Sequence, residues 1–155
     1  MSSKPNTAAS AIIAVLGLAV ISMAHLDNLT IAQSQTFTAK LTGNDETPPV
    51  STAATGTAHF QLSSDGKQLN YDLSVEKLNG YSHSHIHQGK AGESGQAVVE
   101  LSMGKGTITS SDLKGPLAGK QISDLVKMIK SGEAYVNVHT QKNQMGELRG
   151  QVMSG

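Results

Sequence analysis

Cysteine and tryptophan are both missing from this chain of 155 residues. The lack of cysteine excludes disulfide bonds, thiolate zinc sites and blue-copper centres, in which a cysteine sulfur binds the metal. Aromatic residues are also few, with two phenylalanines and three tyrosines, so the stacking platforms of single-stranded nucleic-acid binders are not expected. Any metal site in this chain must therefore use nitrogen, oxygen or thioether ligands.

An excess of charge of either sign is missing as well, because twelve Lys and Arg residues balance twelve Asp and Glu residues. A strongly basic surface is the usual footprint of nucleic-acid binding, and this balance does not predict one. The sixteen glycines, together with many Thr, Ser and Val residues, are typical of short strands joined by tight turns. The composition favours a small β domain that binds no nucleic acid.

The N-terminal segment has a different character, with an uncharged apolar run over residues 8–24 that follows Lys4. This run is short for a spanning helix, which needs roughly 20 apolar residues, but long enough for the apolar part of a signal peptide. We interpret residues 1–34 as an export signal with its linker, and an uncleaved membrane anchor is the alternative. Both interpretations predict an extracytoplasmic mature domain over residues 35–155, and they leave His25 without a role.

From residue 35 onward the sequence alternates between apolar and polar residues in short stretches that are separated by turn formers. The predicted strands are residues 36–41, 56–62, 68–75, 81–87, 97–101, 134–140 and 147–152. Residues 122–129 instead have a helical period, and we expect Ser123 to cap this short helix and Gly132 to end it. The pattern predicts an all-β fold, a Greek-key β-sandwich or barrel of about seven to eight strands with one short helix.

Three of the six histidines occupy alternate positions in one predicted strand, at His83, His85 and His87. Side chains at such positions point to the same face of a strand, about 7 Å apart along it. A fourth, His139, lies in the predicted strand over residues 134–140. Imidazoles that lie so near to one another can bind a single metal ion, so we predict a metal site. The alternative is a solvated polar strand face that carries histidines without binding anything.

The alternation also assigns these side chains to faces. Ile86 is the apolar residue between His85 and His87, which puts both histidines on a polar face. His139 and Arg149 occupy the polar positions of the last two predicted strands. We therefore expect all of them to meet on the outside of the core, where solvent and small anions reach.

Three segments of the chain, in this order, resemble the CHRD domain, which is named after chordin and is found in many exported proteins of bacteria and archaea. They are Leu41-Thr-Gly-Asn-Asp-Glu-Thr-Pro-Pro-Val50, His85-Ile-His87 with its following Gly-rich loop, and Tyr135-Val-Asn-Val-His139 followed by Gly146-Glu-Leu-Arg-Gly-Gln151. The resemblance runs from about residue 37 to residue 152. It implies a β-sandwich-like domain but no single activity.

The resemblance also covers the candidate ligands. His85, His87 and His139 match histidines that recur in the family, whereas His83 is a departure from the family pattern. His83 is thus a fourth ligand, a group that supports a ligand, or incidental.

A histidine site without cysteine in an exported protein points first to copper, because Cu(II) binds nitrogen sites more tightly than the other divalent first-row ions. Zinc fits the same ligands. A copper ion with an open coordination position can bind superoxide, and Arg149 would attract this anion. The arrangement is similar to the copper site of copper/zinc superoxide dismutases, without a second cluster for zinc. We therefore expect a copper-only superoxide dismutase.

Three other functions stay open at this point. The chain is alternatively a copper carrier without turnover, an extracellular interaction domain with structural histidines, or a zinc hydrolase with Glu147 as general base. Three other sets of residues carry lower weight. His59 could approach the site but is expected on a strand surface, and Met145 and Met103 could be soft ligands for Cu(I) but are expected to serve packing. Asp45 and Glu46 could orient a histidine N–H from their loop. The sequence does not specify an oligomeric state.

Overall fold

The computed structural model describes residues 34–155, so the predicted export segment and His25 lie outside the described residues. The strands are β1 (Thr36–Thr42), β2 (Thr55–Leu62), β3 (Leu69–Glu76), β4 (Tyr81–Gln88), β5 (Ala97–Leu101), β6 (Gly104–Ile108), β7 (Ala134–Thr140), β8 (Leu148–Gln151) and β9 (Met153–Ser154). The helices are α1 (Ile122–Lys130) and two 3₁₀ turns, Ser110–Asp112 and Gly115–Leu117. The predicted all-β fold with one short α-helix is confirmed. Nothing helical within residues 34–155 combines the length and the apolar character that crossing a membrane requires.

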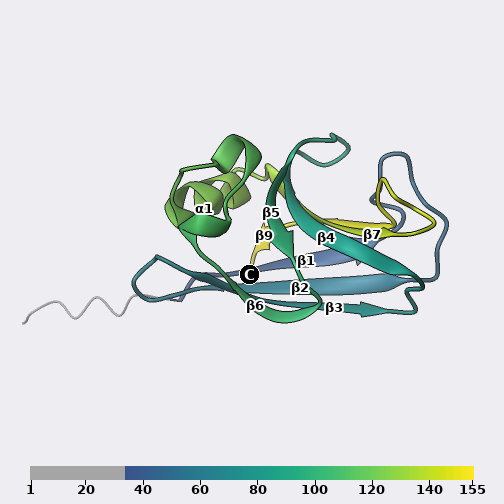
Figure 1. Cartoon of the computed structure of the whole chain (residues 1–155), viewed down its shortest axis with the longest axis horizontal. Coiled ribbons are helices and arrows are strands. Elements are labelled where there is room, and N and C mark those ends of the chain that lie inside the picture. Colours follow the sequence, from purple (N-terminus) through teal and green to yellow (C-terminus); the bar gives the residue numbers. More distant parts are fainter. Residues whose placement is uncertain (1–33) are drawn as a thin grey trace, which may run out of the picture. The chain divides into compact units, whose positions relative to one another are not determined.

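The strands form one antiparallel sheet in the order β5-β4-β7-β8-β1-β2-β3-β6, and β9 pairs with β1. β5 and β6 are the two ends of this order, although only Ser102 and Met103 separate them in the chain. The sheet therefore curls until its edges approach each other, as in a nearly closed barrel. The backbone N–H of Ser102 donates to the Tyr71 hydroxyl of β3 at 3.0 Å and ties the connection to the sheet. Figure 1 shows β4, β5 and β7 lying over β1, β2 and β3.

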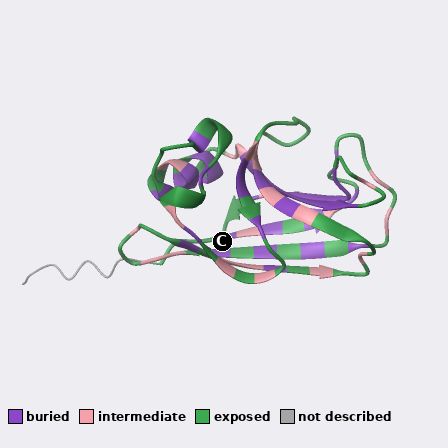
Figure 2. Cartoon of the chain, viewed as in Figure 1, coloured by how far each residue is buried: buried purple, intermediate pink, exposed green. Residues whose placement is uncertain are grey.

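The apolar side chains of the two layers meet in one core. Along β1 and β2 buried and exposed residues alternate, with Phe37 and Phe60 among the largest buried side chains, as the banding of these strands in Figure 2 shows. β7 differs, because all seven of its residues are buried. One face of β7 thus packs on the core while loops cover the other face. This is the strand that carries His139.

The N-terminal cap of the helix differs from the expectation. α1 is capped by Gln121 rather than by Ser123, because the Asp124 carboxylate accepts the backbone N–H of Gln121 at 3.1 Å. Gly132 follows the C-cap Ser131 with a φ of +73° and ends the helix as expected.

Strand β6 was not predicted, because its glycines interrupt the apolar alternation. Gly106 is needed there, since a Cβ at this position would lie 2.4 Å from the Tyr71 ring.

Candidate metal centre

The pairing of β4 with β7 brings three of the four predicted histidines together. His83 is the register partner of His139, and their rings stack with centroids 4.2 Å apart. His85 lies two residues further along β4, on the same face, and its ring centroid is 5.4 Å from that of His139. One potential ligand atom from each of His83, His85 and His139 lies within 4.8 Å of the other two. We call this set the histidine triad.

Hydrogen bonds preset the imidazoles of the triad for metal binding. Nδ1 of His139 lies 2.9 Å from the carbonyl oxygen of Gln144, so this nitrogen carries the proton and Nε2 keeps its lone pair. Nε2 of His139 is also the atom that lies 3.5 Å from Nδ1 of His85. Nδ1 of His83 contacts the Ser82 hydroxyl at 2.7 Å. Metal-binding histidines characteristically hold their second nitrogen in this way, so the residues present fit a metal ion.

His87, the remaining predicted ligand of β4, lies outside the triad. Its Nδ1 faces the carbonyl oxygen of Gly95 at 2.9 Å, and its ring stacks on Tyr135 with centroids 5.1 Å apart. Among residues 34–155, its buried Nε2 has no hydrogen-bond partner. The pairing of β4 with β5 shifts its register between Ile86 and His87, an irregularity of the kind that re-aims a side chain. His59 lies on β2 and is not part of the triad.

The expectation that all these side chains face solvent is wrong for His139, which is 6% exposed. Three loops cover the outer face of β7. Each loop makes one hydrogen bond to this face: Glu46 with Asn137, Gly95 with Tyr135, and Gln144 with His139. His83 and His85 are half-buried, so the triad is open to solvent only on the side of β4.

The pKa of His139 is lowered from 6.5 to about 4, chiefly by burial and also by the neighbouring His83, His85 and His87, against the raising effect of the hydrogen bond to Gln144. A histidine whose folded pKa lies below its unfolded value favours the folded state above the unfolded pKa. We therefore expect the metal-free protein to lose stability as the pH falls from about 6.5 to about 4. Urea unfolding across this range, with His139→Asn as the comparison, should show a smaller loss in the variant. Equal losses of stability in the two proteins would contradict the assignment of this pH dependence to His139.

Arg149, predicted to guide an anion, lies on β8 opposite Asn137 of β7. It is 3% exposed. Its Cζ lies 3.6 Å from the centre of the Tyr135 ring, and its Nη2 donates to the carbonyl oxygen of Lys90 at 2.8 Å. Arg149 and His139 line one cavity of about 150 Å³. The two residues thus share a face of the sheet, but Arg149 is not a surface charge.

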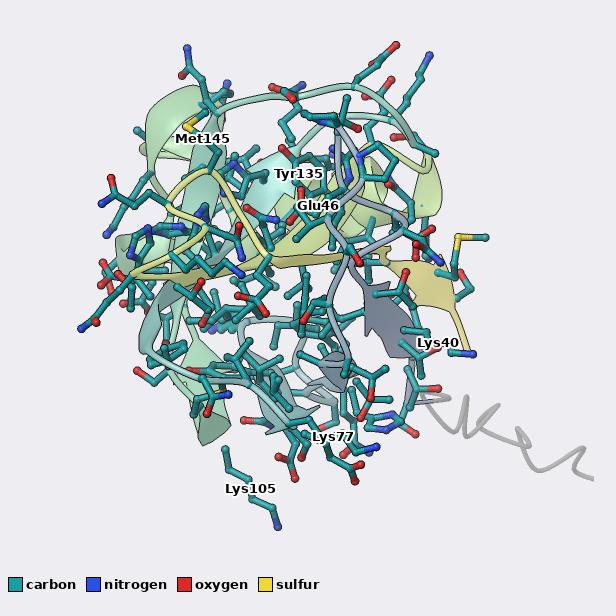
Figure 3. The ribbon with its side chains drawn as sticks, turned by 90° about the vertical axis from the view of Figure 1, so that its right-hand side faces the viewer. Lys40, Glu46, Lys77, Lys105, Tyr135 and Met145 are labelled. Carbon is teal, nitrogen blue, oxygen red and sulfur yellow. The ribbon has the colours of Figure 1, made fainter. Side chains whose placement is uncertain are left out.

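Glu46 and Asn137 are two polar residues of this cavity to which the sequence analysis gave little or no weight. The Glu46 carboxylate, a low-weight candidate for orienting a histidine, accepts a hydrogen bond from Nδ2 of Asn137. Glu46 lies beside Tyr135 in the view of Figure 3. Burial raises the pKa of Glu46, while hydrogen bonds from Asn137 and Thr47 oppose the rise. Asn137 alternates with His139 along β7, a signal that could have placed it at the site.

Glu147, the general base of the hydrolase hypothesis, does not belong to the triad. Its carboxylate accepts hydrogen bonds from the hydroxyls of Thr52 and Thr140, both at 2.7 Å, and from the Asn143 amide at 2.8 Å. Within residues 34–155, the group of possible metal ligands contains histidines alone. The chemistry of the triad is therefore that of neutral imidazole ligands.

The family model of the CHRD domain matches residues 37–152. This match includes every residue of the triad and of the cavity beside it. No curated protein and no solved structure matches the chain.

Proposed function

We propose that this chain, which belongs to the CHRD domain family, binds a copper ion through His83, His85 and His139. The observation that carries the proposal is the convergence of their three ligand atoms within 4.8 Å of one another. CHRD domains occur in extracellular proteins, which agrees with the export signal expected in residues 1–34.

Copper is favoured over other metals by the donor set. The triad offers neutral imidazole nitrogens, which suit copper, zinc, iron and nickel, whereas carboxylates would favour magnesium, calcium or manganese. Among divalent ions at such nitrogen sites Cu(II) binds most tightly. Zinc remains the alternative, because three histidines and an open position also make a zinc site.

The reaction that we propose for this site is superoxide dismutation, in which two superoxide ions and two protons give dioxygen and hydrogen peroxide. A bound copper ion would supply the one-electron oxidation and reduction. Three imidazoles would hold the ion, and His83 and His85 are half-buried, so the site is accessible from their side. The buried charge of Arg149 contributes a positive potential from the cavity that it shares with His139, which favours an anion at the site.

The test loads the full chain with Cu(II), removes loosely held metal and follows superoxide decay by stopped flow. We expect decay in proportion to bound copper, and none above background in the metal-free protein or in the zinc-loaded protein. Copper that stays bound without turnover would reject the dismutase and leave a copper-binding protein. Failure to retain copper would reject both.

A further inference from the structure

A polar cavity of about 150 Å³ lies beside the triad, under the loops that cover β7 and β8. We propose that this cavity binds a small oxyanion that carries one O–H group, such as bicarbonate. The polar groups that argue for it come from Glu46, His87, Asn137 and Arg149. A single water needs only about a tenth of such a volume, so an anion of four non-hydrogen atoms fits. The cavity shares His139 with the triad, but binding of the anion in it does not require a metal ion.

The guanidinium of Arg149 is the anchor for the anion. A buried guanidinium stays charged and has five N–H donors. Among residues 34–155 it makes one hydrogen bond, to the carbonyl oxygen of Lys90, and no carboxylate lies within salt-bridge distance of it. The Tyr135 ring compensates part of the charge through its face. A buried charge with unused donors is stabilised when an oxyanion accepts two of them side by side.

The other polar groups of the cavity explain why the ligand needs an O–H group. The carboxylate of Glu46 is an acceptor, and Nε2 of His87 is an acceptor too, because Nδ1 of that ring already faces the carbonyl oxygen of Gly95. An anion such as nitrate would turn only lone pairs toward these two groups. Bicarbonate can direct two oxygens at Arg149 and donate its O–H to the acceptor side.

The experiment is a chemical-shift titration of the metal-free full chain, which follows the backbone amides of Gly95 and Gln144 at the cavity. With bicarbonate we expect one saturable curve in the millimolar range, as suits a ligand of four non-hydrogen atoms. The affinity for nitrate should be at least about 10-fold lower than that for bicarbonate, because nitrate turns a lone pair toward Glu46. Equal affinities would overturn the requirement for the O–H group, and the lack of a saturable shift would overturn the site.

Two variants and one control make the test specific. Arg149→Met keeps a side chain against Tyr135 but removes the charge, and it should weaken bicarbonate binding about 10-fold or more. Lys40→Met removes a charge from the exposed side of β1 (Figure 3) and should leave binding unchanged. Glu46→Gln should narrow the difference in affinity between nitrate and bicarbonate, because the repulsive carboxylate is gone and only Nε2 of His87 still favours an O–H donor.

These variants also keep the proposal falsifiable if one of them does not fold. If Arg149→Met loses its native amide spectrum, the change in selectivity between bicarbonate and nitrate in Glu46→Gln tests the site instead. Bicarbonate binding that survives Arg149→Met in a folded protein would overturn the site. A Glu46→Gln protein that discriminates against nitrate as strongly as the original chain would overturn the role of the carboxylate.

Discussion

Replacing His139 with alanine should lower copper affinity by about 100-fold or more while the protein stays folded. Structural metal sites with four ligands contribute about 10–16 kcal/mol in all, so one ligand accounts for about 3 kcal/mol, or roughly two factors of ten. His139 is the member of the triad whose Nδ1 is fixed by the Gln144 carbonyl and whose ring is almost fully buried. Its loss removes the ligand that is held most firmly before metal binding, by burial and by a backbone hydrogen bond together. Competition titrations of Cu(II) against a chelator of known affinity would measure the effect.

His87→Phe is the matched control for this variant. Phenylalanine keeps the stacking on Tyr135 but removes both ring nitrogens, so a ligand would be lost if His87 bound the metal. Because His87 stands outside the triad, we expect its copper affinity to stay within a few-fold of the original. A loss as large as that of His139→Ala would show that His87 moves into the site when metal is present, and that the metal-free geometry understates the ligand set.

His83→Ala tests in the same assay whether His83 is a copper ligand, and we expect it to lower copper affinity. From the resemblance to the family, His85 and His139 are expected to follow a recurring pattern and His83 to depart from it, and yet the ring of His83 stacks on His139. A full loss of affinity would show that this chain has acquired a ligand of its own. Unchanged affinity would show that His83 is incidental and would return His87 to consideration.

The alternation of apolar and polar residues was enough to locate most of the strands in the sequence. It was also enough to assign the candidate ligands to one face. The period of two in β4 and β7 is strong, because Ile86 and Val138 are fully buried between polar neighbours. That signal put His85 and His139 on a shared side, and the pairing of β4 with β7 then made them neighbours. Strand β6 was not predicted because two glycines interrupt its alternation; the Tyr71 ring leaves no space for a side chain at Gly106, and Gly104 has a positive φ.

Alternation could not reveal what covers a polar face. From the sequence alone, the outer side of β7 is expected to face solvent, because Asn137 and His139 are polar. In the structure it is a buried polar layer, held together by hydrogen bonds to loops distant in sequence, such as that of Asn137 to Glu46. The separation of His87 from the triad has a similar origin, since a register shift beside Ile86 is a property of strand pairing that one strand's sequence does not encode.

Gly146→Ala is expected to destabilise the protein by about 3 kcal/mol or more, through overpacking and a broken buried hydrogen bond. Gly146 has a φ of +130°, and a Cβ there would lie 2.3 Å from Oε1 of Glu46 and 2.6 Å from Nδ2 of Asn137. These are the two atoms that join the loop after β1 to β7. The methyl group must therefore push this hydrogen bond apart. Urea unfolding of the metal-free variant would measure the loss.

Gly92→Ala isolates the steric part of this effect. Gly92 also has a positive φ, +79°, but a Cβ there meets nothing within 4 Å, so the substitution carries the backbone strain alone, about 1 kcal/mol. Similar losses in the two variants would mean that the contact between Glu46 and Asn137 contributes little. The contact also bears on the metal site, because Gly146 belongs to the same short loop as Gln144, whose carbonyl fixes His139. Gly146→Ala should therefore weaken copper binding and Gly92→Ala should not, which would identify the covering loop as part of what orients the ligand.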